Sequence, residues 1–177
     1  MTYKIYSKAS RTLVPLFFIL VLVIQFSCTD DESFTKSPTA ILSFPCDTLK
    51  LDTAISGIAT STYSFVIRNH NSQGIKIVKA SLDNGEASGF QVAVDGVNIN
   101  DSYNHVIEVR KKDSITVYVK LKTKENNDDA VRTVSDKISF MLESGTIQTV
   151  TLLGYSQDVN TLSNLVIEKD TVLQSTR

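Results

Sequence analysis

The sequence is poor in the residues that most often build a catalytic or metal centre. It has two cysteines and two histidines among 177 residues. His70 and His105 lie far apart, and neither has the nearby acid or second histidine of a zinc motif. The sequence also lacks the G-x-S-x-G turn that presents a nucleophilic serine and the glycine-rich loop that holds a phosphate. An enzyme is therefore the least expected class, and no catalytic residue, metal or cofactor is predicted.

An excess of positive charge is also missing. The chain has 18 basic and 19 acidic side chains, a formal net charge of −1. No basic stripe of the kind that follows a phosphate backbone stands out. Nucleic acid is therefore not an expected partner.

The one long apolar run covers residues 13–24, "LVPLFFILVLVI", and contains Pro15. A membrane-spanning helix needs about 20 apolar residues, so this run is short for a span. Lys4, Lys8 and Arg11 precede it without any acid. This layout predicts a cleaved export signal over residues 1–27, with an uncleaved helix in the inner membrane as the alternative.

The segment that follows, "QFSC", resembles the lipobox of bacterial lipoproteins, although it differs from the usual pattern at Gln25 and Phe26. That resemblance implies acylation of the Cys28 thiol, cleavage before Cys28, and a lipid anchor in the outer membrane. The next residues, "TDDES", are similar to the acidic signal for surface display in Bacteroidetes lipoproteins. The signal residues would be Asp30, Asp31 and Glu32. A solvated tether is the alternative reading of this acidic run.

Cleavage at this site would remove three basic residues and leave 15 basic and 19 acidic groups, a net charge of −4. Cys46 would then be a single thiol, so no structural disulfide is expected and a small buried side chain is predicted. Residues 28–40 are polar, acidic and broken by Pro38, which predicts a flexible tether.

From residue 41 onward the sequence alternates as β-strands do. The clearest case is residues 114–124, "SITVYVKLKTK", where apolar and polar positions alternate over several repeats. The predicted inner face holds Ile115, Val117, Val119 and Leu121, and the outer face holds Thr116, Tyr118, Lys120 and Lys122. Similar patterns occupy residues 61–69 and 136–144, and weaker ones 49–53, 75–82, 90–96, 105–110 and 146–156.

About eight short strands separated by polar turns predict an antiparallel, immunoglobulin-like β-sandwich of seven to nine strands, with a closed barrel as the alternative. The strongest hairpin signal is "ESGT", where Gly145 is able to adopt positive φ. No helix is expected after the N-terminal signal.

Residues 41–158 resemble an immunoglobulin-like domain of Bacteroidetes surface lipoproteins, related in pattern to the ASPM, SPD and Hydin type. The shared phrases are "STYSFVIRNHN" and the late strand "LLGYSQD". Longer relatives often continue into a parallel β-helix. That resemblance implies that residues 159–177 are a C-terminal extension, either of a short form or at the start of a truncated further module.

Two small patterns suggest further sites. "DGVNIND" offers Asp95, Asn98, Asn100 and Asp101 as calcium ligands, but without EF-hand spacing, so a solvated turn is the favoured reading. Four Asp-Ser/Thr-aliphatic triplets resemble the Bacteroidetes O-glycosylation sequon. Their acceptors would be Thr48, Thr53, Ser114 and Thr171.

These patterns together indicate a lipid-anchored, non-catalytic interaction or structural module of the cell envelope. The partners expected are the membrane, through the lipid, and a protein or glycan ligand that the sequence does not identify. A periplasm-facing lipoprotein that assists assembly of an envelope complex is the alternative. A sandwich fold hosts unrelated functions, so the site has to come from the structure.

Overall fold

The computed structural model describes residues 32–100, 105–127 and 130–159. Contacts divide the chain into two compact units, Met1–Asp31 and Glu32–Arg177, and every described residue belongs to the second. Cys28, Asp30, Asp31 and Thr171 lie outside the described residues. A unit with its own hydrophobic core is able to fold alone.

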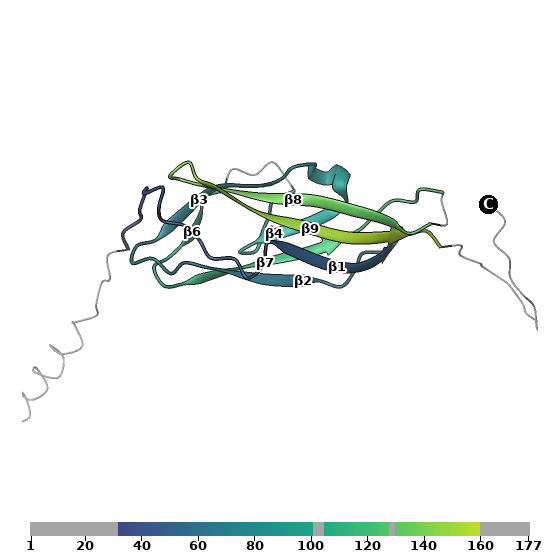
Figure 1. The fold of residues 1–177 in the computed structure, drawn as a ribbon, viewed down its shortest axis with the longest axis horizontal. Helices are drawn as coiled ribbons and strands as arrows, with labels where there is room; N and C mark the ends of the chain where they lie inside the picture. Colours follow the sequence, from purple (N-terminus) through teal and green to yellow (C-terminus); the bar gives the residue numbers. More distant parts are fainter. Residues whose placement is uncertain (1–31, 101–104, 128–129, 160–177) are drawn as a thin grey trace, which may run out of the picture. The chain divides into compact units, whose positions relative to one another are not determined.

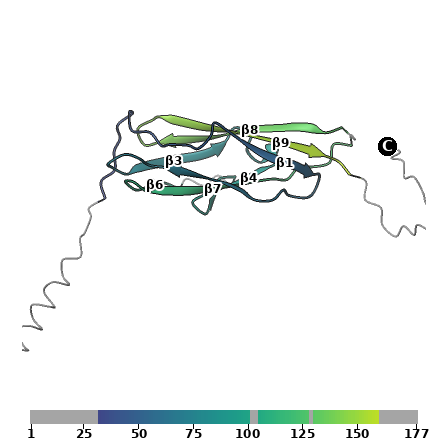
Figure 2. The same ribbon diagram turned by 60° about the horizontal axis from the view of Figure 1, so that its bottom comes forward.

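The described residues form two β-sheets that pack as two layers (Figures 1 and 2). The larger sheet has the order β1-β9-β8-β3-β6 and the smaller has the order β2-β7-β4-β5. The strands are β1 (Thr48–Ile55), β2 (Tyr63–Arg68), β3 (Ile75–Leu82), β4 (Phe90–Val94), β5 (Val97–Asn98), β6 (Ile107–Val109), β7 (Ser114–Leu121), β8 (Arg132–Leu142) and β9 (Ile147–Gln157). A 3₁₀ helix, η1 (Gly85–Ser88), is the one helix in these ranges.

This arrangement confirms the predicted all-β sandwich. Two separate sheets with edge strands replace the closed barrel that was the alternative. Among the residues described, no helix is long and apolar enough to cross a membrane.

The core follows the predicted alternation. On β7 the side chains of Ile115, Val117, Val119 and Leu121 are all buried, while Tyr118 and Lys120 are exposed. β8 buries Ile138, Phe140 and Leu142 in the same way. Each buried apolar side chain contributes about 1.5–3 kcal/mol relative to exposure, so these rows fix which face of each strand points inward.

The β8–β9 hairpin is confirmed at the predicted place. Gly145 has φ of 85°, and its N–H donates to the Leu142 carbonyl at 2.9 Å. The Leu142 N–H in turn donates to the Thr146 carbonyl at 2.9 Å. A turn followed by a left-handed glycine is a common three-residue hairpin connection.

The first strand pairs in a way that the sequence did not indicate. β1 runs parallel to β9, with Thr48 opposite Thr151 and Ile55 opposite Gln157. The register shifts between Lys50 and Thr53, which places consecutive residues on the exposed side. This bulge interrupts the edge strand β1. Natural sheets often carry such bulges at their edges, where they hinder pairing with a strand of another chain.

The tether was predicted to cover residues 28–40, but this prediction extends too far toward the C-terminus. Gly74 donates its N–H to the Ser33 carbonyl at 2.8 Å and accepts the Thr35 N–H at 2.9 Å. A Cβ at Gly74 would lie 2.6 Å from the Phe34 ring, so the absent side chain makes room for that ring. Ala40 is also buried. Residues 33–40 therefore pack on the sandwich, because Phe34 and Ala40 bury apolar surface there.

The described chain begins and ends at opposite ends of the sandwich (Figure 1). Residues 33–35 lie against Gly74, just before β3, close to the β8–β9 hairpin. Asp158, just after β9, accepts the Asn126 N–H at 2.7 Å at the far end. The first and the last described residues therefore lie at opposite ends of the long axis of the sandwich.

Removing the Phe34 ring should release residues 33–40. For Phe34→Ala we expect a loss of about 1–2 kcal/mol in the free energy of unfolding, because a half-buried aromatic ring is removed. Limited trypsin digestion should cut after Lys36 faster than in the wild type. Gly74→Ala should act in the same direction, and Ile41→Ala, at a side chain 53% exposed, is the control. Unchanged cleavage and stability in both variants would restore the tether reading.

Candidate functional site

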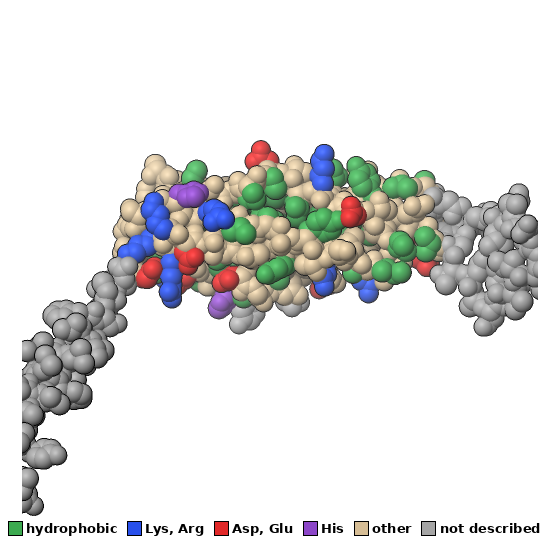
Figure 3. All heavy atoms as spheres, turned by 90° about the horizontal axis from the view of Figure 1, so that it is seen from below, with side chains coloured by type: hydrophobic (Ala, Val, Ile, Leu, Met, Phe, Trp, Pro, Cys, Tyr) green, Lys and Arg blue, Asp and Glu red, His purple; other side chains and the backbone are tan. Residues whose placement is uncertain are grey.

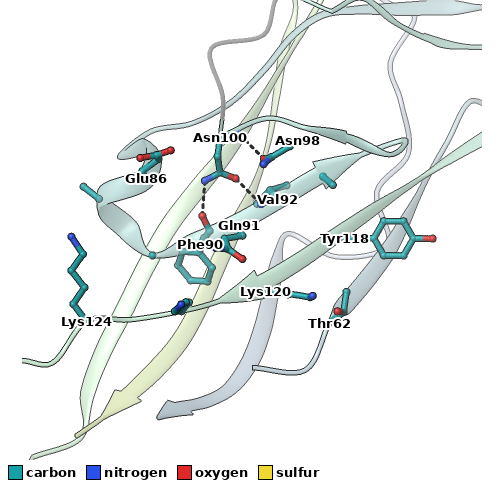
Figure 4. A pocket seen from close by; sticks show the side chains of 14 residues that line it. Thr62, Glu86, Phe90, Gln91, Val92, Asn98, Asn100, Tyr118, Lys120 and Lys124 are labelled. Atoms are coloured by element: carbon teal, nitrogen blue, oxygen red, sulfur yellow. Dashed lines mark hydrogen bonds between the residues drawn. The ribbon is translucent and has the colours of Figure 1, made fainter. Parts of the chain in front are cut away.

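An open groove of about 900 Å³ lies on the outer face of the four-stranded sheet (Figure 4). We call it the β7 groove. Its lining comes from β7 and the residues after it, from β4 and β5, from η1 and from Thr62. The lining residues are Thr62, Glu86, Ala87, Gly89, Phe90, Gln91, Val92, Ala93, Asn98, Asn100, Tyr118, Lys120, Lys122 and Lys124.

Two positions of the floor carry little or no side chain, Ala93 on β4 and Gly89 just before it. Gly89 and Ala93 lie between the β7 row and the η1 and β5 segments. Gly89 has φ of 79°, and a Cβ there would lie 2.6 Å from the Lys122 carbonyl oxygen. A larger residue at position 89 would therefore be strained in both conformation and packing.

One wall is a row of long side chains from β7 and its continuation. Tyr118 and Lys120 are alternate residues of β7 and share its outer face at an interval of about 6.6 Å. Lys122 and Lys124 follow the end of the strand and line the same groove. Tyr118 is 46% exposed and lies opposite Ala93, whose small side chain leaves the ring uncovered. The three ammonium groups form no salt bridge with any described residue.

The opposite wall is held by an asparagine that replaces a strand partner. The Asn100 side chain accepts the Val92 N–H at 2.8 Å and donates to the Phe90 carbonyl at 2.7 Å. β5 ends at Asn98, so this amide continues the pairing of β4 beyond the strand (Figure 4). The Asn98 side chain accepts the Asn100 N–H at 3.0 Å and fixes the turn.

A buried carboxylate fixes the η1 side. Asp136 is 4% exposed and lies on the inner face of β8. Its Oδ1 accepts hydrogen bonds from the Asn84 backbone N–H at 3.2 Å and from the Asn84 side chain at 3.1 Å. Asn84 immediately precedes η1, which carries Glu86 into the groove. Figure 4 shows Glu86 and Lys124 toward one side and Tyr118 and Thr62 toward the other.

The lining of the groove has more basic than acidic side chains. In Figure 3, basic, acidic and histidine side chains gather toward the end at which the described chain begins. Ion pairs occur at that end: Lys36–Glu143 at 2.9 Å and Lys76–Glu108 at 2.8 Å. The hydrogen bond from Lys76 to Glu108 raises the pKa of the Lys76 ammonium group. In the groove, three cations face a single lining acid, Glu86, so the groove has an unbalanced positive charge.

The calcium reading of residues 95–101 finds no support. Asp95 and Gly96 have φ of 49° and 79° and form the two-residue turn between β4 and β5. The amide oxygens of Asn98 and Asn100 already accept backbone N–H groups, and Asp101 lies outside the described residues. Within the described ranges, no group of three or more His, Cys, Asp or Glu side chains is placed to hold a metal.

The three proposed glycosylation acceptors that the structure describes are not brought together. Thr48 and Thr53 are exposed on β1, in the larger sheet, whereas Ser114 is half-buried at the start of β7. The Ser114 N–H donates to the Asp113 carboxylate at 2.7 Å, as in an ordinary turn. None of these residues lines the β7 groove.

The remaining singled-out residues are dispersed. Glu32 is half-buried at the start of the described chain, and His70 and His105 are both exposed. Cys46 is a free thiol and is half-buried, so the predicted burial of this side chain is only partial. Cys46 lies between the exposed residues Pro45 and Asp47, just before the edge strand β1.

Comparisons with known proteins give the following matches. No described protein family and no curated protein matches the sequence. A solved family 123 glycoside hydrolase from Clostridium perfringens is 13% identical, with a TM-score of 0.47 over 64% of this chain and 23% of that one. A protein of unknown function from Porphyromonas gingivalis W83 is 9% identical, with a TM-score of 0.47 over 73% of this chain and 50% of that one.

A third solved structure, the ASH/PapD-like domain of human CEP192, is 12% identical, with a TM-score of 0.39 over 72% of this chain and 92% of that one. This chain thus spans half or less of the length of the first two proteins. The sandwich architecture itself is established by the strand order given above.

The groove wall should depend on Asn100. In Asn100→Ala, the Val92 N–H and the Phe90 carbonyl lose their partners, which should lower the free energy of unfolding by about 1–3 kcal/mol. Asn98→Ala removes one hydrogen-bond acceptor from an exposed side chain, so it should lower the free energy of unfolding by a smaller amount. Chemical denaturation of both variants measures the difference. Equal losses would show that Asn100 does not hold the edge of β4.

Proposed function

We propose that this protein is a lipid-anchored, non-catalytic interaction module of the cell envelope, displayed at the outer-membrane surface. The observation that carries the proposal is the β7 groove, an open hollow with an exposed tyrosine and three lysines that lack ion-pair partners among the described residues. Exposed side chains that lack ion-pair partners and project from a sheet are suited to contact a ligand.

The geometry of the domain is compatible with an anchor at Cys28. Residues 29–32 separate Cys28 from the first packed residue, Ser33, and span at most about 17 Å when extended. The domain would therefore sit close to the bilayer. Two or three acyl chains would hold it there without any membrane-binding surface on the sandwich.

The groove lysines lie toward the other end of the domain. The start of β7, Ser114, pairs with Arg68 near the N-terminal end, and the strand then rises about 23 Å to Leu121. Lys122 and Lys124 follow beyond that point. An anchored protein would thus present these lysines away from the bilayer, where a ligand outside the membrane has access to them.

The anchor is tested by changing each cysteine in turn. Cys28→Ala should abolish incorporation of labelled fatty acid into the protein, whereas Cys46→Ala should stay lipid-modified. Lipid modification that survives Cys28→Ala would overturn the anchor.

Surface display is tested by protease treatment of intact cells. The wild-type domain should be removed by the protease, whereas a triple variant, Asp30→Ala with Asp31→Ala and Glu32→Ala, should stay lipid-anchored and protected. Complete protection of the wild type would replace surface display with the periplasm-facing alternative.

A further inference from the structure

We propose that the β7 groove binds an anionic glycan, a carbohydrate chain that carries carboxylate or sulfate groups. This inference rests on the proposed function and names the ligand class of the same site. It depends on three features of the groove: its charge, its exposed aromatic ring, and its position on the face of the sheet.

The charge favours an anion with repeated negative groups. Lys120, Lys122 and Lys124 are all exposed and line the groove. None of them forms a salt bridge with a described residue, and Glu86 is the one acidic side chain among the described residues of the lining. A ligand with several spaced anionic groups would pair with these three ammonium groups.

The aromatic ring favours a sugar. Tyr118 is 46% exposed, and its cross-strand neighbours Ser64 and Ala93 are too small to cover the ring. An uncovered ring offers a flat apolar surface against which the C–H face of a pyranose packs. Gln91 and Thr62, both exposed beside Lys120, supply donors and acceptors for hydroxyl groups.

The position of the groove disfavours a peptide. β7 lies between β2 and β4, and its backbone is paired on both sides, so the part of the groove along β7 offers side chains and no unpaired backbone. The edge strand β5 has only two residues, and beyond it the Asn100 side chain already pairs with the Val92 N–H and the Phe90 carbonyl. An extended peptide gains most of its affinity from main-chain hydrogen bonds at a sheet edge and would leave its own amides unpaired here.

A single-stranded nucleic acid is disfavoured for a different reason. Sites for such strands stack successive bases on several aromatic side chains. In this groove Phe90 is fully buried, so Tyr118 is the single exposed ring of the lining. One ring and three lysines fit a charged sugar better than a row of bases.

The experiment is calorimetric titration of the chain from Thr29 onward, which retains the whole compact unit Glu32–Arg177. The probes are oligogalacturonate, which is carboxylated, and a chondroitin sulfate oligosaccharide. The comparison ligands are maltohexaose, which is neutral, poly-glutamate, which is an acidic peptide, and oligodeoxythymidine. We expect at least one anionic oligosaccharide to bind, and to bind more weakly as salt is raised.

The key variant changes Lys120, Lys122 and Lys124 to Gln. Its matched control changes Lys50, Lys79 and Lys137 to Gln, which removes the same charge from the outer face of the other sheet. The groove variant should lose about tenfold in affinity, because three exposed ion pairs are removed, and the control should keep it. Tyr118→Ala should also weaken binding, whereas Tyr118→Phe should retain it.

Equal losses in the groove and control variants would overturn the proposal, since binding would then follow net charge alone. Absence of binding to both anionic oligosaccharides would also overturn it. If poly-glutamate or oligodeoxythymidine bound more tightly than both anionic oligosaccharides, and if that binding required the three lysines, the glycan would be the wrong ligand class. The groove would still be the binding site. None of these results bears on the lipid anchor, which the Cys28 and protease experiments test separately.

Discussion

Strict alternation of side chains along β7 ties the core of the domain to its groove. Val117, Val119 and Leu121 are fully buried and lie between the two sheets. Because successive residues of a strand point to opposite faces, burial of these three forces Tyr118, Lys120 and Lys122 outward. A slip of one residue would drive two lysines into an apolar core, at a cost of many kcal/mol. The register that fills the core therefore also builds the groove.

The strands could be predicted because their signal is local. Alternation on β7 and β8, and the glycine of the "ESGT" turn, are visible in short windows of sequence, and the structure confirms them. The parallel pairing of β1 with β9 was not predictable, because it joins residues about a hundred positions apart and leaves no local pattern. The packing of Phe34 on Gly74 was missed for the same reason, since the segment reads as polar.

Only part of the candidate site could be predicted from the sequence. Alternation placed Tyr118, Lys120 and Lys122 on the outer face, but it does not tell whether an outer face is flat or hollow. The depth comes from Gly89 and Ala93, and the far wall comes from the bonds of Asn100 to β4. In the sequence Asn98 and Asn100 resembled possible cation ligands. In the fold their amides complete backbone pairing, because turn asparagines often bond to neighbouring main chain.

A buried polar network closes the end of the domain opposite to Phe34. The Ser156 and Thr123 hydroxyls lie 2.5 Å apart, and the Asp158 carboxylate bonds to Ser56 and to the Asn126 N–H. Satisfied networks of this kind fix a single arrangement of the loops that they join. Lys124 lies two residues before Asn126, so this network supports the distal part of the groove.

Backbone amide NMR of the chain from Thr29 onward, during titration with oligogalacturonate, locates the ligand contact. If the ligand binds on the outer face of β7, chemical-shift changes will concentrate at residues 86–93 and 118–124, with little change on β1, β8 and β9. Changes concentrated on the larger sheet, or at the N-terminal end around Gly74, would show that the ligand binds elsewhere.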